Sequence, residues 1–264
     1  MPALIFDCDG VLADTERDGH RPAFNQAFAE AGLPVAWSEA EYGELLKIGG
    51  GKERIASLFT DAFVREHDLP ADDAGRAELI AHLHKRKTAI YKEIVHAGRL
   101  PGRPGVARIV GEALTAGWTL AVASTSAEES VRAVLEHVVG ADTAAGFAVF
   151  AGDVVPAKKP DPGIYLLALD ELGIAPADAI VIEDSRNGLL AAVGANLSCV
   201  VTVSGYTAAE DMREAVLVVT SLGDPGEPAR VLAGRNAGRP GELVTIADLE
   251  ACLREPASEE EETV

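Results

Sequence analysis

Short apolar runs alternate with stretches of helical periodicity along much of the chain. The runs lie at residues 3–6, 118–123, 147–150, 179–182, 199–203 and 216–219. They are rich in β-branched residues and apolar at nearly every position, which is typical of strands buried on both faces of a parallel sheet. The pattern therefore predicts an α/β fold, with a parallel sheet covered by helices on both faces.

The spacing of these runs is uneven, because more than a hundred residues separate the first run from the second. The intervening stretch has helical periodicity: Phe24 and Phe28 lie four residues apart. A second helical set consists of Ile55, Leu58, Phe59, Ala62 and Phe63, which follow the 3.6-residue period. We predict a helical cap domain at 17–98, inserted into a Rossmann-like α/β core formed by 1–16 and 99–264.

Two further segments complete the predicted organisation. The segment "GRLPGRPG" at 98–105 is the predicted return hinge, and "GELVTIADLEACL" at 241–253 predicts one more strand and helix. Open α/β sheets bind ligands at the carboxyl ends of their strands, so we expect the cap to lie over that edge.

Composition and charge narrow the possible partners. The chain has 264 residues, 48% of them hydrophobic, and a formal net charge of −19, which disfavours nucleic acid and anionic membranes as partners. No apolar run approaches 18 residues, so we expect a cytoplasmic protein that acts as a monomer on a small molecule. The cysteines Cys8, Cys199 and Cys252 are predicted to be reduced thiols in the core.

Polar side chains follow four of the predicted strands. They are Asp7 and Asp9, then Ser124, then Lys158 and Lys159, then Glu183 and Asp184. Two carboxylates about 4 Å apart repel by roughly 1–4 kcal/mol at effective dielectrics between those of water and a protein surface, so Asp7 and Asp9 require a counter-charge or a proton. Acids and a lysine around one pocket suit Mg²⁺-assisted phosphoryl transfer, in which Asp7 attacks phosphorus and Asp9 exchanges protons with the leaving oxygen and with water.

The motifs "DCDG", a serine that ends the second strand, "KKP" and "IEDS" resemble, in order, the four motifs of the haloacid-dehalogenase superfamily. The resemblance covers roughly residues 1–220. It implies that Asp7 is the nucleophile and that Asp9 is the acid/base, with its backbone carbonyl as a metal ligand. It also implies that Ser124 binds phosphate and that Lys159 ties phosphate to the nucleophile. Asp7, Asp9, Glu183 and Asp184 are the implied Mg²⁺ ligands.

Within that superfamily the chain is similar to the CbbY type. The similarity lies in "DTERDGHRPAFN", "YGELLKIGGGKERI", "HKRKTAIYKEI" and "SGYTA". Phosphatases of this type remove the 1-phosphate of xylulose 1,5-bisphosphate, an inhibitor of Rubisco. The resemblance implies that Glu16 and Tyr42 lie near the sugar hydroxyls, and we include Thr125 among the substrate-binding residues.

The cap sequence adds an independent argument about substrate choice. Lys87 interrupts an apolar stripe on a predicted helix, so a cation there needs either an anionic partner or a route for its ammonium group to the surface. Gly50 and Gly51 precede a predicted helix whose first turn carries Lys52 and Arg54. Together these groups are predicted to bind the distal phosphate of a bisphosphate.

Several alternatives remain open from the sequence. His20 is either a substrate contact or a solvent-facing helix residue. Ser126 and Glu129 form an S-x-x-E capping box, which leaves Ser124 available for phosphate. The leading function is a sugar-bisphosphate phosphatase. The alternatives are a phosphomutase of the β-phosphoglucomutase type, a catalytically silent sugar-phosphate sensor, and a broad-specificity phosphatase.

Overall fold

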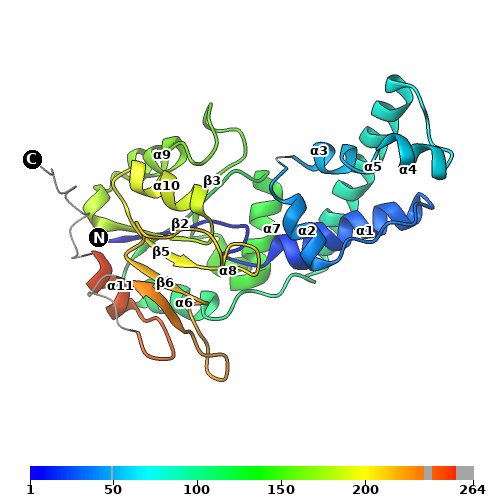
Figure 1. Ribbon diagram of the computed structural model, residues 1–264. Coiled ribbons are helices and arrows are strands. Elements are labelled where there is room, and N and C mark those ends of the chain that lie inside the picture. Colours follow the sequence, from blue (N-terminus) through cyan, green and yellow to red (C-terminus); the bar gives the residue numbers. More distant parts are fainter. Residues whose placement is uncertain (49, 235–239, 254–264) are drawn as a thin grey trace, which may run out of the picture. The chain divides into compact units, whose positions relative to one another are not determined.

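The computed structural model describes residues 1–48, 50–234 and 240–253 (Figure 1). The described chain divides into two compact units. One consists of Thr15–Leu100, and the other consists of Met1–Asp14 with the described residues from Pro101 onward. The first is called the cap unit below and the second the core unit.

The core unit contains a seven-stranded sheet in the order β3-β2-β1-β4-β5-β6-β7. The strands are β1 Ala3–Phe6, β2 Thr119–Ser124, β3 Ala148–Ala151, β4 Ala179–Glu183, β5 Ser198–Thr202, β6 Leu217–Val219 and β7 Val231–Gly234. Strands β1 to β6 pair in parallel and β7 pairs antiparallel with β6. The predicted α/β fold is therefore confirmed.

Helices cover both faces of this sheet, as Figure 1 shows. They are α6 Val106–Thr115, α7 Glu128–Val139, α8 Ala141–Ala144, α9 Gly163–Leu172, the 3₁₀ turn η2 Pro176–Asp178, α10 Arg186–Gly194 and α11 Ile246–Leu253. Helices α9 and α10 pack on one face, and α6, α7 and α11 pack on the other. Strand β1 is completely buried because it lies at the centre between β2 and β4.

The cap unit is helical. Its elements are the π-helical turn η1 Glu16–His20, followed by α1 Arg21–Glu30, α2 Glu39–Leu45, α3 Gly51–Ala56, α4 Asp61–Glu66 and α5 Asp73–His96. Helix α5 packs against both α1 and α3. Phe24 and Phe28 of α1 pack with Trp37, with ring centroids 5.1 and 4.8 Å from the indole. This aromatic group forms much of the interior of the cap unit.

Two sequence expectations require correction. The periodic stretch across 55–63 is divided between α3 and α4, because the Thr60 side chain accepts a bond from the Phe63 N–H (3.3 Å) and begins a new helix. Residues 241–245 form no strand, since Thr245 instead caps α11 through reciprocal bonds with Asp248. The predicted helix in this segment is confirmed as α11. The last strand of the sheet, β7, lies before this segment and was not predicted.

The structure also tests the expectations about the cysteines and about membrane-spanning helices. Cys8, Cys199 and Cys252 are buried thiols, as predicted. None of the helices described in the structure is long and apolar enough to cross a membrane.

Candidate active site

The predicted catalytic residues of the core unit lie at the carboxyl ends of neighbouring strands. Strands β2, β1 and β4 are adjacent, with Phe6 paired to Val122 on one side and to Ile182 on the other. Asp7 directly follows β1. It therefore lies between Ser124, at the end of β2, and Glu183, at the end of β4. Parallel pairing thus gathers residues that are far apart in the sequence.

Lys159 connects two of these carboxylates. Its ammonium donates to Asp7 Oδ1 (2.6 Å), to Glu183 Oε1 (2.7 Å) and to the Ala123 carbonyl (2.9 Å). The three acceptors lie at or next to the carboxyl ends of β1, β2 and β4. The preceding Lys158 is exposed and lies 3.7 Å from Asp153, so it is a surface neighbour as expected.

Burial and charge determine the protonation of this group. Burial, together with the charges of Glu183 and Asp9, raises the pKa of Asp7 to about 7, against the attraction of Lys159. Burial lowers the pKa of Lys159, but the two adjacent carboxylates outweigh that effect and hold the pKa above its ordinary value. Lys159 is thus a permanent cation beside the predicted nucleophile.

A cluster of three acids suits a hard metal ion. Oxygens of Asp7, Glu183 and Asp184 lie within 4.8 Å of one another, and all three residues are buried. Burial, together with the charges of Glu183 and Asp7, raises the pKa of Asp184 well above its ordinary value. An all-oxygen donor set whose own charges repel one another fits a divalent cation such as Mg²⁺.

Two glycines allow these carboxylates to approach the backbone. A Cβ at Gly10 would lie 2.1 Å from Asp184 Oδ2, and the φ of Gly10 is +79°. A Cβ at Gly188 would lie 2.0 Å from Glu183 Oε2. Any side chain at either position would displace a carboxylate of the acidic cluster.

Ser126 contacts the predicted acid/base and does not cap α7. Its hydroxyl donates a close hydrogen bond to Asp9 Oδ2. The N-cap of α7 is Ala127, which makes no side-chain cap bond, so the expected Ser126–Glu129 capping box is wrong. The Ser124 hydroxyl accepts from the Ser126 N–H (3.2 Å). Ser126 is therefore a site residue that the sequence interpretation assigned to another role.

Tyr165 of α9 is a second site residue that the sequence did not indicate. Its hydroxyl donates to Glu183 Oε1 (2.5 Å), and its ring centroid lies 4.9 Å from the Lys159 ammonium. Tyr165 occurs within a run of apolar helix residues, where an aromatic residue is typical of a core position. The sequence contains no signal that separates this role from packing.

The cap unit contains a polar cluster formed by predicted substrate-binding residues. The Tyr42 hydroxyl donates to Glu16 Oε2 (2.6 Å) and accepts from Arg54 Nη1 (3.1 Å). Arg54 Nη1 also lies 3.8 Å from Glu16 Oε1. The structure thus brings together three residues that lie up to 38 positions apart.

Lys87 and His20 form the adjoining part of this cluster. Lys87 Nζ lies 2.9 Å from His20 Nδ1 and sits over the rings of Phe24 (4.6 Å) and Tyr91 (5.4 Å). Lys87 is only 7% exposed, so most of its side chain is buried within the cap unit. Burial and the nearby cations lower the pKa of His20 well below its ordinary value, which keeps the ring neutral and lets Nδ1 accept from Lys87.

The remaining predicted substrate-binding residues have simpler surroundings. Gly50 has a φ of +98° and precedes α3, which begins at Gly51, while Gly49 lies outside the described residues. Lys52 is exposed in the first turn of α3. Thr125 is half-buried and follows Ser124.

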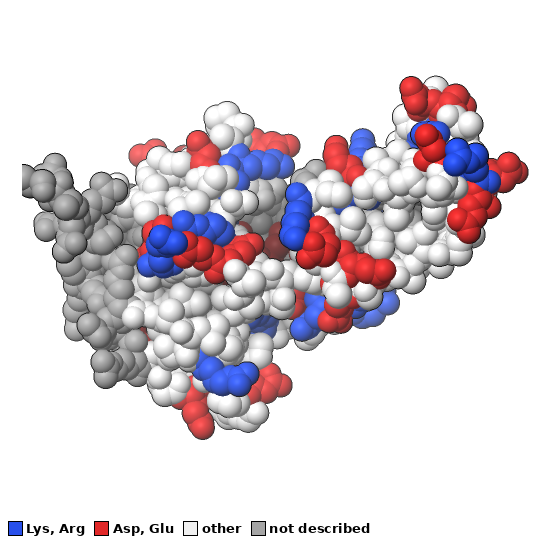
Figure 2. All heavy atoms as spheres, viewed as in Figure 1, with Lys and Arg blue, Asp and Glu red and all other residues white. Residues whose placement is uncertain are grey.

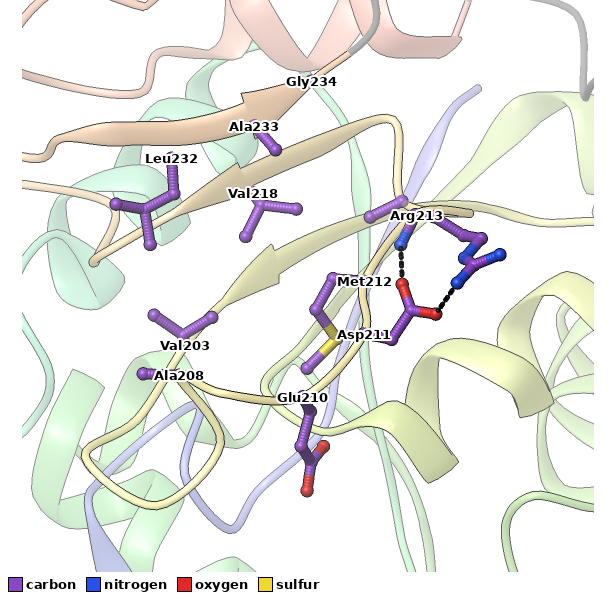
Figure 3. A pocket seen from close by; sticks show the side chains of 11 residues that line it. Val203, Ala208, Glu210, Asp211, Met212, Arg213, Val218, Leu232, Ala233 and Gly234 are labelled. Atoms are coloured by element: carbon purple, nitrogen blue, oxygen red, sulfur yellow. Dashed lines mark hydrogen bonds and ion pairs between the residues drawn. The ribbon is translucent and has the colours of Figure 1, made fainter.

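A cavity of about 490 Å³ lies elsewhere in the core unit (Figure 3). Met212, Val218 and Leu232 contribute to its apolar lining, and none of the predicted site residues lines it. Of its charged groups, Arg213 pairs with Asp211 (2.5 Å) and Glu210 accepts from a backbone N–H (2.6 Å). These charged groups are already engaged within the protein.

Basic and acidic side chains are interspersed on the face shown in Figure 2. Among the described residues, several basic side chains pair with acids, such as Arg17 with Asp18 (2.7 Å) and Arg76 with Asp61 (3.2 Å).

The fold and the four strand-end motifs define a hydrolase of the haloacid-dehalogenase type, and comparison with known proteins agrees. A model of the haloacid dehalogenase-like hydrolase family matches residues 1–196, so the chain belongs to this family.

Several of its relatives are CbbY proteins. The chain is 52% identical over 225 residues to a CBBY-like protein of Arabidopsis thaliana, covering 85% of this chain and 70% of that one. It is 44% identical to the plasmid CbbY of Cupriavidus necator, over 86% of this chain and 88% of the other. A crystal structure of a mutant CbbY from Rhodobacter sphaeroides in complex with xylulose 1,5-bisphosphate superposes with a TM-score of 0.68 at 40% identity, covering 84% and 95% of the two chains. The chain is thus a CbbY-like phosphatase.

Proposed function

We propose that the protein is a Mg²⁺-dependent sugar-bisphosphate phosphatase that removes the 1-phosphate of xylulose 1,5-bisphosphate through an aspartyl-phosphate on Asp7. The observation that carries the proposal is the pairing of Lys159 with Asp7 and Glu183 beside Asp184. The naming of xylulose 1,5-bisphosphate rests on similarity to the CbbY protein that was crystallised with it.

In this mechanism the Asp7 carboxylate attacks phosphorus and the bond between phosphorus and the sugar oxygen breaks. Asp9 protonates the leaving sugar oxygen. Asp9 then removes a proton from water, which attacks phosphorus and releases inorganic phosphate and the Asp7 carboxylate. Lys159 neutralises the charge that accumulates between the nucleophile and the phosphoryl oxygens, and the Ser124 hydroxyl donates to the phosphate.

The residues that would hold Mg²⁺ are Asp7, Glu183 and Asp184, together with the backbone carbonyl of Asp9. When bound, the ion supplies positive charge that lets an anionic nucleophile approach an anionic phosphate. The buried cluster supports this assignment because each of its members offers a hard oxygen ligand.

Ser126 is expected to hold Asp9 in position for proton transfer. Ser126→Ala should lower kcat about 10- to 100-fold, because a hydrogen bond to a charged group is worth roughly 1.5–3 kcal/mol. KM should change little. Steady-state kinetics check this expectation, and Ser126→Thr, which keeps the hydroxyl, should recover most of the activity. Equal kcat for the wild type and the alanine variant would contradict it.

The cap cluster supports recognition of a second phosphate. Lys87 and Arg54 are cations held in place by aromatic and polar neighbours, and we propose that they bind the distal phosphate with help from Lys52 and the backbone of Gly50 and Gly51. We further propose that Glu16, Tyr42, His20 and Thr125 contact the substrate.

Lys87→Met tests this role while preserving the buried apolar stem. We expect kcat/KM for xylulose 1,5-bisphosphate to fall about 10- to 100-fold, whereas activity on a small monophosphate should stay within about threefold. Arg54→Ala should act in the same direction. Lys85→Ala, an exposed lysine on the same helix, is the matched control and should leave both activities unchanged. Equal losses on both substrate types would contradict a role in binding the distal phosphate.

The function itself is tested by phosphate release from a substrate panel with and without Mg²⁺. The panel contains xylulose 1,5-bisphosphate, ribulose 1,5-bisphosphate, fructose 1,6-bisphosphate, β-glucose 1-phosphate and simple monophosphates, and glucose 6-phosphate formation is followed in parallel. Selective hydrolysis of the xylulose compound is the expected result. Glucose 6-phosphate with little free phosphate would instead identify a mutase, and equal rates across the panel would identify a broad-specificity phosphatase.

A further inference from the structure

Arg103 lies in the return linker, and its guanidinium joins backbone segments at the carboxyl end of the sheet. One terminal nitrogen donates to the carbonyls of Gly10 and Thr202, and the other donates to those of Val203 (2.7 Å) and Thr220 (2.8 Å). The acceptors come from three places: the loop after β1, the end of β5 and the residue that follows β6. A single planar group thus ties the loop after β1 to the ends of two strands.

The loop after β1 carries the proposed acid/base and borders the acidic cluster. Gly10 follows Asp9 directly, and its Cα hydrogens face the Asp184 carboxylate so closely that a Cβ would overlap it. A shift of the Gly10 carbonyl therefore moves the backbone of Asp9 and changes the contact with Asp184. The Arg103 guanidinium donates to this carbonyl and so restrains its position.

The backbone of Arg103 reinforces the same attachment. Its N–H donates to the Leu12 carbonyl (2.9 Å), and the preceding Gly102 forms an antiparallel bridge with Ala13. The outgoing and returning connections between the two units are therefore paired at their core-unit ends, and Arg103 anchors that pair to β5 and β6.

We propose that Arg103 is a positioning residue that holds the loop after β1 in register with the acidic cluster, and so sets the geometry of the proton-transfer and metal-binding groups. The proposal rests on the catalytic roles proposed above for Asp9 and Asp184. Lysine cannot replace arginine in this role, because one ammonium on a flexible stem has only three donors and lacks the rigid fork with which the guanidinium bonds to four carbonyls.

The chain offers a matched control in Arg108 of α6. Its guanidinium also donates to several backbone carbonyls, those of Leu222 (2.8 Å), Gly223 (2.8 Å) and Val244 (2.9 Å). These acceptors belong to segments that carry none of the proposed catalytic residues. Arg103→Lys and Arg108→Lys therefore remove the same kind of bond from two places in one unit.

The experiment compares the wild type and both variants by three measurements: hydrolysis of p-nitrophenyl phosphate, the Mg²⁺ concentration for half-maximal activity, and the rise in melting temperature that Mg²⁺ alone produces. For Arg103→Lys we expect kcat to fall about 10- to 100-fold, a higher Mg²⁺ requirement and a smaller Mg²⁺-induced rise. Arg108→Lys should lose a similar amount of thermal stability but keep wild-type values for kcat and both magnesium measurements.

Equal kcat and magnesium responses in the two variants would overturn the proposal, because Arg103 would then only stabilise the fold. Loss of a cooperative melt in both Arg103→Lys and Arg103→Gln would also overturn it, since the guanidinium would be required for folding and not for placing the loop. The Mg²⁺-induced rise is measured without substrate. A wrong substrate or mechanism therefore appears as a failure of wild-type hydrolysis, which is distinct from a failure of the role of Arg103.

Discussion

Asp7→Asn is expected to abolish phosphate release, with kcat lowered at least about 10⁴-fold, as when other enzymes lose their nucleophile. An amide of the same shape keeps the position of the side chain at the end of β1 but cannot form the acyl phosphate that the carboxylate forms. The folded variant should also fail to become phosphorylated when substrate is added. Mass spectrometry of the intact protein, together with the phosphate assay, measures both effects.

The fold should survive this substitution for an electrostatic reason. The pKa of Asp7 is about 7 in the metal-free folded protein and 3.8 in an ordinary environment, so the folded state binds the proton more tightly than the unfolded chain does. The stability that this proton contributes is complete below pH 3.8 and is lost as pH rises through about 7. Asparagine does not ionise, so at pH 8 in chelator the variant should melt at or above the wild-type temperature.

The control is Asp153→Asn, which alters an exposed aspartate of the same unit and should leave activity and melting temperature unchanged. Phosphate release by a folded Asp7→Asn protein at more than about 1% of the wild-type rate would exclude Asp7 as the nucleophile.

Lys159→Met should have the second largest effect on activity and stability. The substitution removes the positive charge that we propose stabilises the transition state, and the same charge balances the buried carboxylates of Asp7 and Glu183. Without the ammonium, Asp7 and Glu183 face each other in a buried site with no cation between them. Removing one partner of a buried ion pair typically costs 3–5 kcal/mol, so we expect a clear fall in melting temperature near pH 8. We expect kcat to fall about 10³-fold, consistent with the loss of a group that stabilises transition-state charge.

Lys158→Met is the matched control for this experiment. Lys158 is adjacent in sequence, but its side chain is 64% exposed and its partner Asp153 is 92% exposed. Surface pairs of this kind contribute at most about 1 kcal/mol, so the control should retain activity and stability. If the two methionine variants behaved alike in thermal melts and kinetics, Lys159 would not be the counter-charge of the acidic cluster.

The central sheet was predictable from the sequence because buried parallel strands leave an uninterrupted apolar run, as in Leu4-Ile5-Phe6 and Ile180-Val181-Ile182. The carboxylates at their ends were predictable for the same reason, since a charge that follows such a run marks the strand end. Strand β7 was not predictable, because all four of its residues are exposed and it pairs only at the sheet edge.

Ser126, Tyr165 and Arg103 were also missed or given another role, and they share one physical feature. Each donates hydrogen bonds to a partner that is distant in the sequence. Ser126 donates to Asp9, Tyr165 donates to Glu183, and Arg103 donates to the carbonyls of Gly10 and Thr220. Local patterns favour a helix cap for the serine, a core position for the tyrosine and a hinge residue for the arginine. Only the tertiary arrangement shows which polar group each one meets.

The proposed reaction can be followed by ³¹P nuclear magnetic resonance of xylulose 1,5-bisphosphate incubated with the protein and Mg²⁺. We expect the resonance of the 1-phosphate to disappear while that of the 5-phosphate remains, with one inorganic phosphate formed per xylulose 5-phosphate and no reaction in chelator. Loss of the 5-phosphate, or no change in either resonance while other sugar phosphates are hydrolysed, would contradict it.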